Sequence, residues 1–100
     1  MNNPYMVLGF GTVTFRLNDC HGLKEKRKII RSLISKSRNG FNAAIAEVDF
    51  NDIHQRAKIG FALVGNDRRT INSQIDKLHE FIYKTALAEI IDTETEILSI

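Results

Sequence analysis

The succession of strand-like and helical patterns constrains the fold of this chain more than any other feature of its sequence. Residues 6–17 are mostly β-branched, aromatic or glycine, and residues 43–50, 56–65 and 89–98 also have strand character. Apolar residues at helical spacing occupy residues 23–38 and about 68–84. The resulting order is the split βαβ arrangement. It predicts a ferredoxin-like α+β domain, with a four-stranded antiparallel sheet, central first and third strands, and both helices on one face.

The first predicted helix is amphipathic and begins after Gly22, which serves as its cap with Glu25 at the third helical position. Asn39 and Gly40 predict a left-handed end for this helix. Lys26 lies on the apolar side, and we expect its stem to follow the edge of the core, with its amine in water or near a carboxylate. The predicted buried stripe consists of Leu23, Ile30, Leu33 and Ile34.

The second half of the chain is predicted to be a hairpin, with its turn at residues 51–54, followed by a helix that Asn66-Asp67 caps. Phe61 shares one face of the third strand with two aliphatic residues, so we expect it to lie under the helices rather than to stack on RNA bases. His79 lies at the margin of the apolar stripe of the second helix and is expected at the surface. That stripe consists of Ile71, Ile75, Leu78 and Ile82.

Length and composition predict one globular domain spanning residues 1–100, because 43% of the residues are hydrophobic and 26% are charged. Cys20 is the single cysteine, which excludes an intramolecular disulfide and a zinc cluster of several thiolates. Residues 1–5 lack the features of a signal peptide, and no apolar run reaches the ~20 residues that a membrane helix needs. We therefore expect a cytoplasmic protein of bacterial type with no membrane partner.

Positive charge is concentrated in residues 21–41, which contain seven of the fourteen basic residues of the chain and one of its twelve acidic residues. A stripe of basic side chains on a helix attracts polyanions, and the arginine fork suits phosphate. The alternative is an ordinary solvated helix face, but such faces usually mix both signs of charge, and here only Glu25 is acidic. We predict that this stripe binds RNA or the ribosome through phosphate contacts. We call it the basic ridge, and it consists of Lys24, Arg27, Lys28, Arg31 and Arg38.

Six short runs, spread over nearly the whole chain, have a specific order and spacing. They are Leu23-Lys24-Glu25-Lys26-Arg27, Phe41-Asn42, Ala46-Glu47-Val48-Asp49, Gln55-Arg56-Ala57, Asn66-Asp67 and Thr93-Glu94-Thr95-Glu96-Ile97-Leu98. These runs resemble the YlxP-like family of small bacterial proteins of unknown function. The resemblance implies a ferredoxin-like fold and no established activity. Because members are often encoded beside translation initiation factor two and ribosome-binding factor A, it also implies a link to the ribosome or its RNA.

Two positions depart from the pattern of that family. Gly22 stands where a serine is usual, which weakens the helix cap. His54 stands where an aromatic residue, often tryptophan, is usual, which puts in doubt a stacking role for that loop.

A cluster of oxygen and nitrogen donors follows the second predicted strand. Glu47 and Asp49 are expected to share a face of this strand, with Asp52 and His54 in the following turn, and such donors can hold a divalent metal ion. Charge on edge strands is common, however, and pairing of Glu47 or Asp49 across the sheet is the favoured interpretation, the candidate partners being Arg16, Arg56 and Lys58. We therefore predict no metal site and no cofactor.

No arrangement typical of catalysis is visible in the sequence. Cys20 and His21 are adjacent, and neighbouring residues rarely aim their side chains at one another, so Cys20 is interpreted as a bystander. Glycine-rich phosphate loops, GxSxG and HExxH are missing. We predict a protein that is not an enzyme and has no small-molecule substrate.

A homo-oligomeric protein-interaction module, without a nucleic-acid role, is the alternative prediction. Leu8 and Phe10 add apolar area to the face of the first strand opposite Val7 and Val13. The last strand is also an edge at which pairing is possible. A homodimer joined through the open sheet face or the edge strand satisfies both features, and it is compatible with RNA binding.

Overall fold

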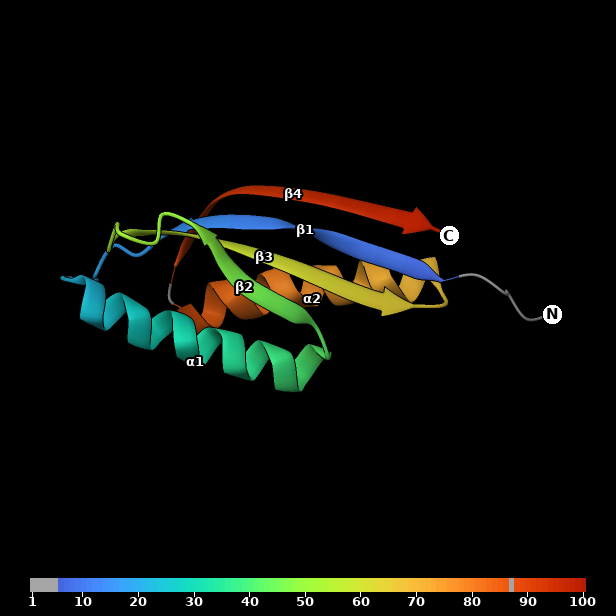
Figure 1. Ribbon diagram of the computed structural model, residues 1–100, viewed down its shortest axis with the longest axis horizontal. Helices are drawn as coiled ribbons and strands as arrows, with labels where there is room; N and C mark the ends of the chain where they lie inside the picture. Colours follow the sequence, from blue (N-terminus) through green and yellow to red (C-terminus); the bar gives the residue numbers. More distant parts are fainter. Residues whose placement is uncertain (1–5, 87) are drawn as a thin grey trace.

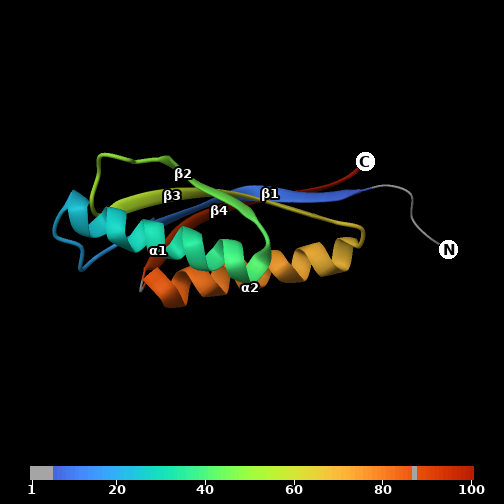
Figure 2. The same ribbon diagram turned by 60° about the horizontal axis from the view of Figure 1, so that its bottom comes forward.

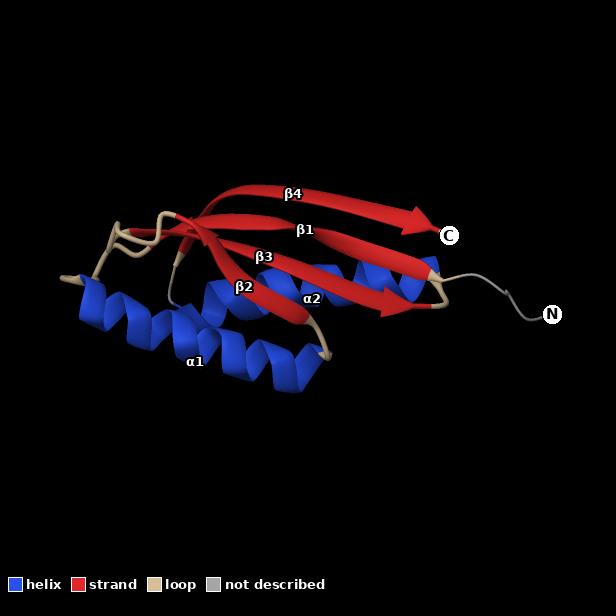
Figure 3. Cartoon of the chain, viewed as in Figure 1, coloured by secondary structure: helices blue, strands red, loops and turns tan. Residues whose placement is uncertain are grey.

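The computed structural model describes residues 6–86 and 88–100, which form two helices and four strands (Figures 1 and 3). In chain order these are β1 (Val7–Arg16), α1 (Leu23–Phe41), β2 (Ala44–Asp49), β3 (Arg56–Gly65), α2 (Arg68–Ala86) and β4 (Glu89–Ser99). The strand order in the sheet is β2-β3-β1-β4, and every neighbouring pair is antiparallel. Both helices cover the same face of this sheet (Figure 2). The predicted ferredoxin-like fold is therefore confirmed, with β1 and β3 in the centre.

The core lies between the sheet and the helix layer. Alternate residues of β1 and β3 face the helices, and among them Val13, Phe15 and Ile59 have no exposed surface. The predicted apolar stripe of α2 is buried along its whole length. Phe61 is 5% exposed and also belongs to this core, as the sequence predicts. Leu8, Phe10, Ala62 and Val64 therefore lie on the opposite, open face of the sheet.

Two glycines of β1 allow close approach of neighbouring segments. A Cβ atom on Gly9 would overlap the Ile71 side chain, and one on Gly11 would overlap the backbone carbonyl of Glu94. These glycines therefore leave the space that α2 and the β4 backbone occupy.

The predicted end of α1 is wrong. The helix continues through Asn39 and Gly40 to Phe41, and Asn42 adopts the left-handed conformation, with φ 50°, while its N–H donates to the Arg38 carbonyl at 3.1 Å. Phe41 packs against the core and against the Phe81 ring, with 5.7 Å between ring centroids. Because local propensity is a weak preference, this packing is sufficient to extend the helix past an Asn-Gly pair.

The start of α2 agrees with the prediction. The Asp67 carboxylate accepts hydrogen bonds from the Thr70 hydroxyl at 2.8 Å and from the Arg69 backbone N–H at 3.3 Å. These hydrogen bonds lower the pKa of Asp67, the Thr70 bond having the larger effect. At α1, by contrast, Gly22 occupies the cap without a side-chain hydrogen bond, and the Glu25 carboxylate accepts from the His21 N–H at 3.0 Å.

Candidate nucleic-acid interface

All five residues of the basic ridge are exposed on α1. The helix is fixed in the layer by its other side, where Ile30 and Leu33 are buried. Within residues 6–86 and 88–100, the ion pairs join Arg16 to Glu89, Lys26 to Glu47 and Lys84 to Glu80, so none includes a ridge residue. The ridge therefore presents uncompensated positive charge to solvent, which favours anionic ligands.

All three arginines of the basic ridge border a groove between α1 and β2. This groove has a volume of about 360 Å³. Ile34 supplies most of its apolar surface, since Ile30 also lines it but is largely buried, and β2 contributes Glu47. Its lining residues are Arg27, Ile30, Arg31, Ile34, Ser35, Arg38 and Glu47. The sequence analysis did not predict this groove, because it forms only where a helix and a strand distant in sequence pack side by side.

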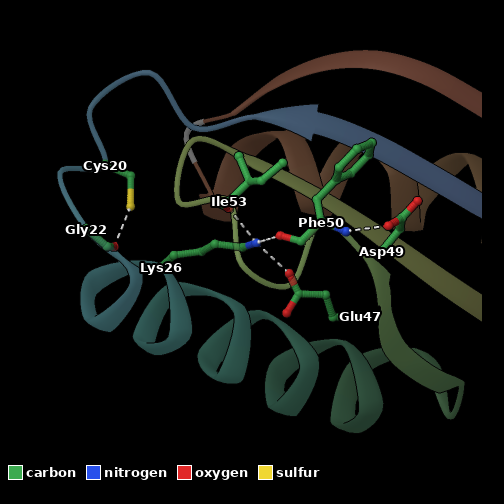
Figure 4. A network of polar contacts seen from close by, with 7 residues as sticks. All are labelled: Cys20, Gly22, Lys26, Glu47, Asp49, Phe50 and Ile53. Atoms are coloured by element: carbon green, nitrogen blue, oxygen red, sulfur yellow. Dashed lines mark hydrogen bonds and ion pairs between the residues drawn. The ribbon is translucent and has the colours of Figure 1, made fainter.

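A buried lysine connects the start of α1 to the segment that joins β2 and β3 (Figure 4). Lys26 is 1% exposed, and its ammonium donates to the carbonyl oxygens of Phe50 and Ile53, the second at 2.7 Å. The same nitrogen lies 2.8 Å from Oε2 of Glu47. Three acceptors surrounding one ammonium offset the cost of removing the charge from water. Lys26 is thus satisfied internally and does not add to the positive charge exposed on the basic ridge.

This arrangement decides between two expectations for Lys26 and corrects one for Glu47. The Lys26 amine lies near a carboxylate rather than in water. Glu47 pairs with this lysine of α1 and not with Arg16, Arg56 or Lys58 of a neighbouring strand. The reason is that Glu47 is in register with Ile59, whose side chain faces the helix layer, so Glu47 projects toward α1.

The expectation that Glu47 and Asp49 share a face is also wrong. The register between β2 and β3 shifts between these two residues, so that Asp49 lies opposite Lys58 while Glu47 lies opposite Ile59. A bulge of this kind places the residues on opposite sides of the sheet. In the part of the chain that the structure describes, no group of three metal-ligating side chains comes together.

The remaining nucleophile and histidine candidates lie outside the groove. Cys20 is 1% exposed, and its thiol donates to the Gly22 carbonyl at 3.4 Å. His79 is more buried than predicted, and its ring lies nearly perpendicular to the Phe61 ring, with a centroid distance of 5.9 Å. This burial lowers the pKa of His79, and the negative charge of Asp76 opposes the shift.

A larger hollow, of about 660 Å³, lies where α2 ends and β4 begins. Its charged residues, Lys84 and Glu89, are each paired with another residue, Glu80 and Arg16 respectively. The groove beside α1 has less volume but borders three arginines outside the ion pairs described above, so it is the better candidate for ligand binding. Neither described helix is long and apolar enough to cross a membrane.

Comparison with known proteins identifies relatives but no activity. Residues 8–95 match the family described as "Protein of unknown function (DUF503)". The uncharacterized protein YlxP of Bacillus subtilis (strain 168) is 29% identical over 90 residues, which cover 90% of this chain and 98% of that protein. These findings confirm the resemblance to the YlxP-like family that the sequence runs indicate.

Two solved structures illustrate how widely this fold is used. A dimeric ferredoxin-like protein of unknown function from Thermobifida fusca YX has a TM-score of 0.55 at 14% identity, and the match covers 100% of this chain and 99% of that one. The Bacillus subtilis YXEP protein, a dinuclear metal-binding peptidase of the M20 family, has a TM-score of 0.57 at 14% identity, with 97% of this chain and 27% of that one covered. Similarity at this level of identity shows the fold alone.

Proposed function

This chain belongs to the DUF503 family of proteins of unknown function, and we propose that it binds RNA or the ribosome through the basic ridge of α1. The proposed role is non-enzymatic. It places the protein in the cytoplasm, because ribosomal RNA is found in that compartment. The observation that supports it most directly is the exposure of all five ridge residues without an ion-pair partner among the described residues. Such a surface binds phosphates with modest affinity and little preference for sequence.

The distribution of charge over the molecule also supports this proposal. Asp92, Glu94 and Glu96 lie in register with β1 residues of the open face, so they form an acidic row on that face of β4. In the sheet order, β4 is the edge strand opposite β2, and α1 lies beside β2 (Figures 1 and 2). A polyanion is therefore attracted to one edge of the molecule and repelled from the other, which orients binding.

Charge reversal of the three ridge arginines tests the proposal. The variant Arg27→Glu, Arg31→Glu, Arg38→Glu should lose co-sedimentation with ribosomes and retention of ribosomal RNA on filters at low salt. Its circular dichroism spectrum should be unchanged, because all three side chains are exposed.

The matched control reverses three exposed basic residues outside the ridge that also have no ion-pair partner among the described residues, through Lys36→Glu, Arg69→Glu and Lys77→Glu. Both variants have the same net charge, so a general loss of attraction would weaken them equally. Binding by the control together with loss of binding by the ridge variant supports the proposal. Retention by the ridge variant would exclude it.

The second candidate is a homodimer joined through the open sheet face. The observation in its favour is an apolar row across this face, in which Leu8 lies between Val64, 63% exposed, and Leu98, 42% exposed. The β4 edge is less suitable, because antiparallel pairing of two copies would bring their acidic rows together. Light scattering at micromolar concentration should give twice the 11.4 kDa chain mass. A Val64→Asp, Leu98→Asp variant should give the monomer mass, and a monomeric unmodified protein would contradict this candidate.

A further inference from the structure

We propose that the groove between α1 and β2 binds an unpaired nucleobase of single-stranded RNA and prefers guanine to uracil, an inference that rests on the proposed RNA-binding function. A surface that contacted only phosphates would need charge but no apolar surface. This groove contains both, because the half-buried Ile34 lines it together with the three ridge arginines, and Ile30, which is 4% exposed, adds a small apolar area. Apolar surface bordered by guanidinium groups suits the flat face of a base, which packs against apolar side chains and stacks on guanidinium planes.

The three arginines are placed to hold the backbone next to such a base. Arg27 and Arg31 are one helical turn apart, or about 6 Å along the axis, and Arg38 is about two turns further on. All three are exposed and line the groove. A base in the groove would therefore have a guanidinium group within reach of the phosphates on either side of it.

Glu47 supplies the preference among bases. Among the residues that the structure describes, it is the one acidic residue that lines the groove, and its side chain is 16% exposed. Lys26 holds Oε2 of this carboxylate, whereas the second oxygen is turned away from the ammonium group (Figure 4). A carboxylate held in place in this way is a rigid acceptor, so little conformational entropy is lost when a base binds to it.

The bases differ in the number and position of the hydrogen-bond donors that they can offer to an acceptor. An ionised carboxylate accepts hydrogen bonds and cannot donate them. Oε2 of Glu47 is buried and paired with Lys26, so the other carboxylate oxygen is the acceptor left for a base. Guanine offers two adjacent donors, N1–H and the 2-amino group, which can share this one oxygen. Uracil offers N3–H between two carbonyl oxygens, which the carboxylate repels. The geometry of the groove thus favours guanine over uracil. Adenine and cytosine each offer one amino group, so their binding should be intermediate between that of guanine and that of uracil.

Fluorescence anisotropy with three labelled decamer RNAs tests this inference on the unmodified protein at about 50 mM salt, where phosphate contacts are strong. One decamer is all uridine, the second has a central guanosine, and the third has a central inosine, which lacks the 2-amino group. The guanosine decamer should bind about fivefold to tenfold more tightly than the uridine decamer, since an open groove retains part of the strength of a charged hydrogen bond. The inosine decamer should lose most of that advantage.

A pair of variants links this preference to Glu47. The Glu47→Gln variant should bind the guanosine and uridine decamers equally, because a carboxamide both donates and accepts. The matched control is Asp49→Asn, which neutralises a carboxylate of the same strand outside the groove and should keep the preference. If Glu47→Gln weakens the fold, the inosine comparison still tests the inference, because it uses the unmodified protein.

The outcomes distinguish failure of the proposed guanine preference from failure of the proposed RNA binding by the basic ridge. Equal binding of all three decamers, abolished by reversal of the ridge arginines, would overturn the guanine preference and leave the proposed RNA-binding function standing. A preference that persists in Glu47→Gln would also overturn the inference. Absence of binding by every decamer and by ribosomal RNA would overturn both proposals.

Discussion

Lys26 has a different role from the other basic residues of α1, although it belongs to the same basic segment of the sequence. Its ammonium is buried, holds Glu47 and donates to two carbonyl oxygens of the segment after β2. Phe50, which provides one of these carbonyls, has a left-handed backbone with φ 61°. The cost of removing two charges from water offsets much of the attraction within such a buried pair, but breaking the pair leaves an unpaired charge inside the protein.

Removal of this ammonium should therefore be costly. Lys26→Met keeps most of the stem and leaves the carboxylate and both carbonyls without their donor, so we expect a loss of about 3 kcal/mol in the free energy of unfolding. The double variant Lys26→Met, Glu47→Leu should recover part of this loss, because the unpaired carboxylate is removed as well. Urea denaturation of the two single variants and the double variant measures the coupling. Strictly additive losses would contradict an energetic link between the two residues.

His79 should make the stability of the fold dependent on pH. Burial lowers its pKa in the folded state below the ordinary value of 6.5. The unfolded chain therefore binds a proton at this site before the folded chain does, and the free energy of unfolding should fall as the pH drops through about 6.5. His79→Asn should reduce this dependence in urea denaturation at pH 7.5 and 5.5. The same substitution at the exposed His21 is the control, and an equal reduction there would rule out His79 as the source.

At the scale of elements, α1 both anchors and displays the candidate site. Its apolar side docks on the sheet and α2, and the opposite side carries the ridge, so the position of the arginines depends on how far and how regularly the helix extends. The helix reaches Phe41 because that ring packs against the core. Arg38 consequently lies within the helix and lines the groove, instead of lying at a frayed end.

The substitution Gly40→Ala distinguishes the observed end of α1, at Asn42, from the end at Gly40 that the sequence suggests. Gly40 is helical and exposed, its backbone is not left-handed, and a Cβ atom there would meet no other group within 4 Å. Gly40→Ala should therefore raise the free energy of unfolding by about 0.5 kcal/mol, as alanine does in exposed helical positions. If Gly40 were the left-handed end that the Asn-Gly pair suggests, the same change would destabilise the protein.

Asn42 should respond in the opposite direction. It has the left-handed conformation that ends α1, and asparagine tolerates this conformation better than other residues with a Cβ atom. Asn42→Ala should lower the free energy of unfolding by about 1 kcal/mol. Thermal or urea denaturation beside Gly40→Ala measures both effects, and a neutral Asn42→Ala would contradict this position of the cap.

At the scale of the whole molecule, the basic ridge and the acidic row of β4 lie apart. The net charge of +2 is small, yet the basic ridge and the acidic row of β4 lie toward opposite edges of the sheet. An asymmetric charge distribution acts over a distance comparable to the screening length, so its effect on binding depends strongly on salt.

RNA binding should follow this dependence quantitatively. If each of the five ridge residues contacts one phosphate, the slope of log K against log salt should be about −3.5 for single-stranded RNA and about −4.5 for duplex. Filter binding across a salt series, with a neutral polymer as the control ligand, measures the slope. The variant with the three ridge arginines reversed should bind too weakly at every salt concentration for a slope to be measured. A slope that is already near zero in the unmodified protein would argue against phosphate contacts.

Sequence patterns were sufficient for the elements, the sheet order and the exposure of the ridge. Apolar periodicity reflects which side of each segment is buried, and one βαββαβ order is compatible with few topologies. Asp67 is an example of a local signal read correctly, because a helix cap depends on residues only two or three positions away. Gly40 is an example of a local signal overruled, because the Phe41 contact with Phe81 spans forty positions of sequence.

The groove, the Lys26–Glu47 pair and the environment of His79 were decided by the tertiary structure. Lys26 meets partners from 21 to 27 positions further along the chain, and a register shift in β2 determines that Glu47 and not Asp49 turns toward α1. Local periodicity carries no information about such long-range packing. The sequence by itself thus determined which fold forms and where its positive charge lies, whereas the packing of α1 against β2 decided which side chains share a groove, since that depends on contacts between distant segments.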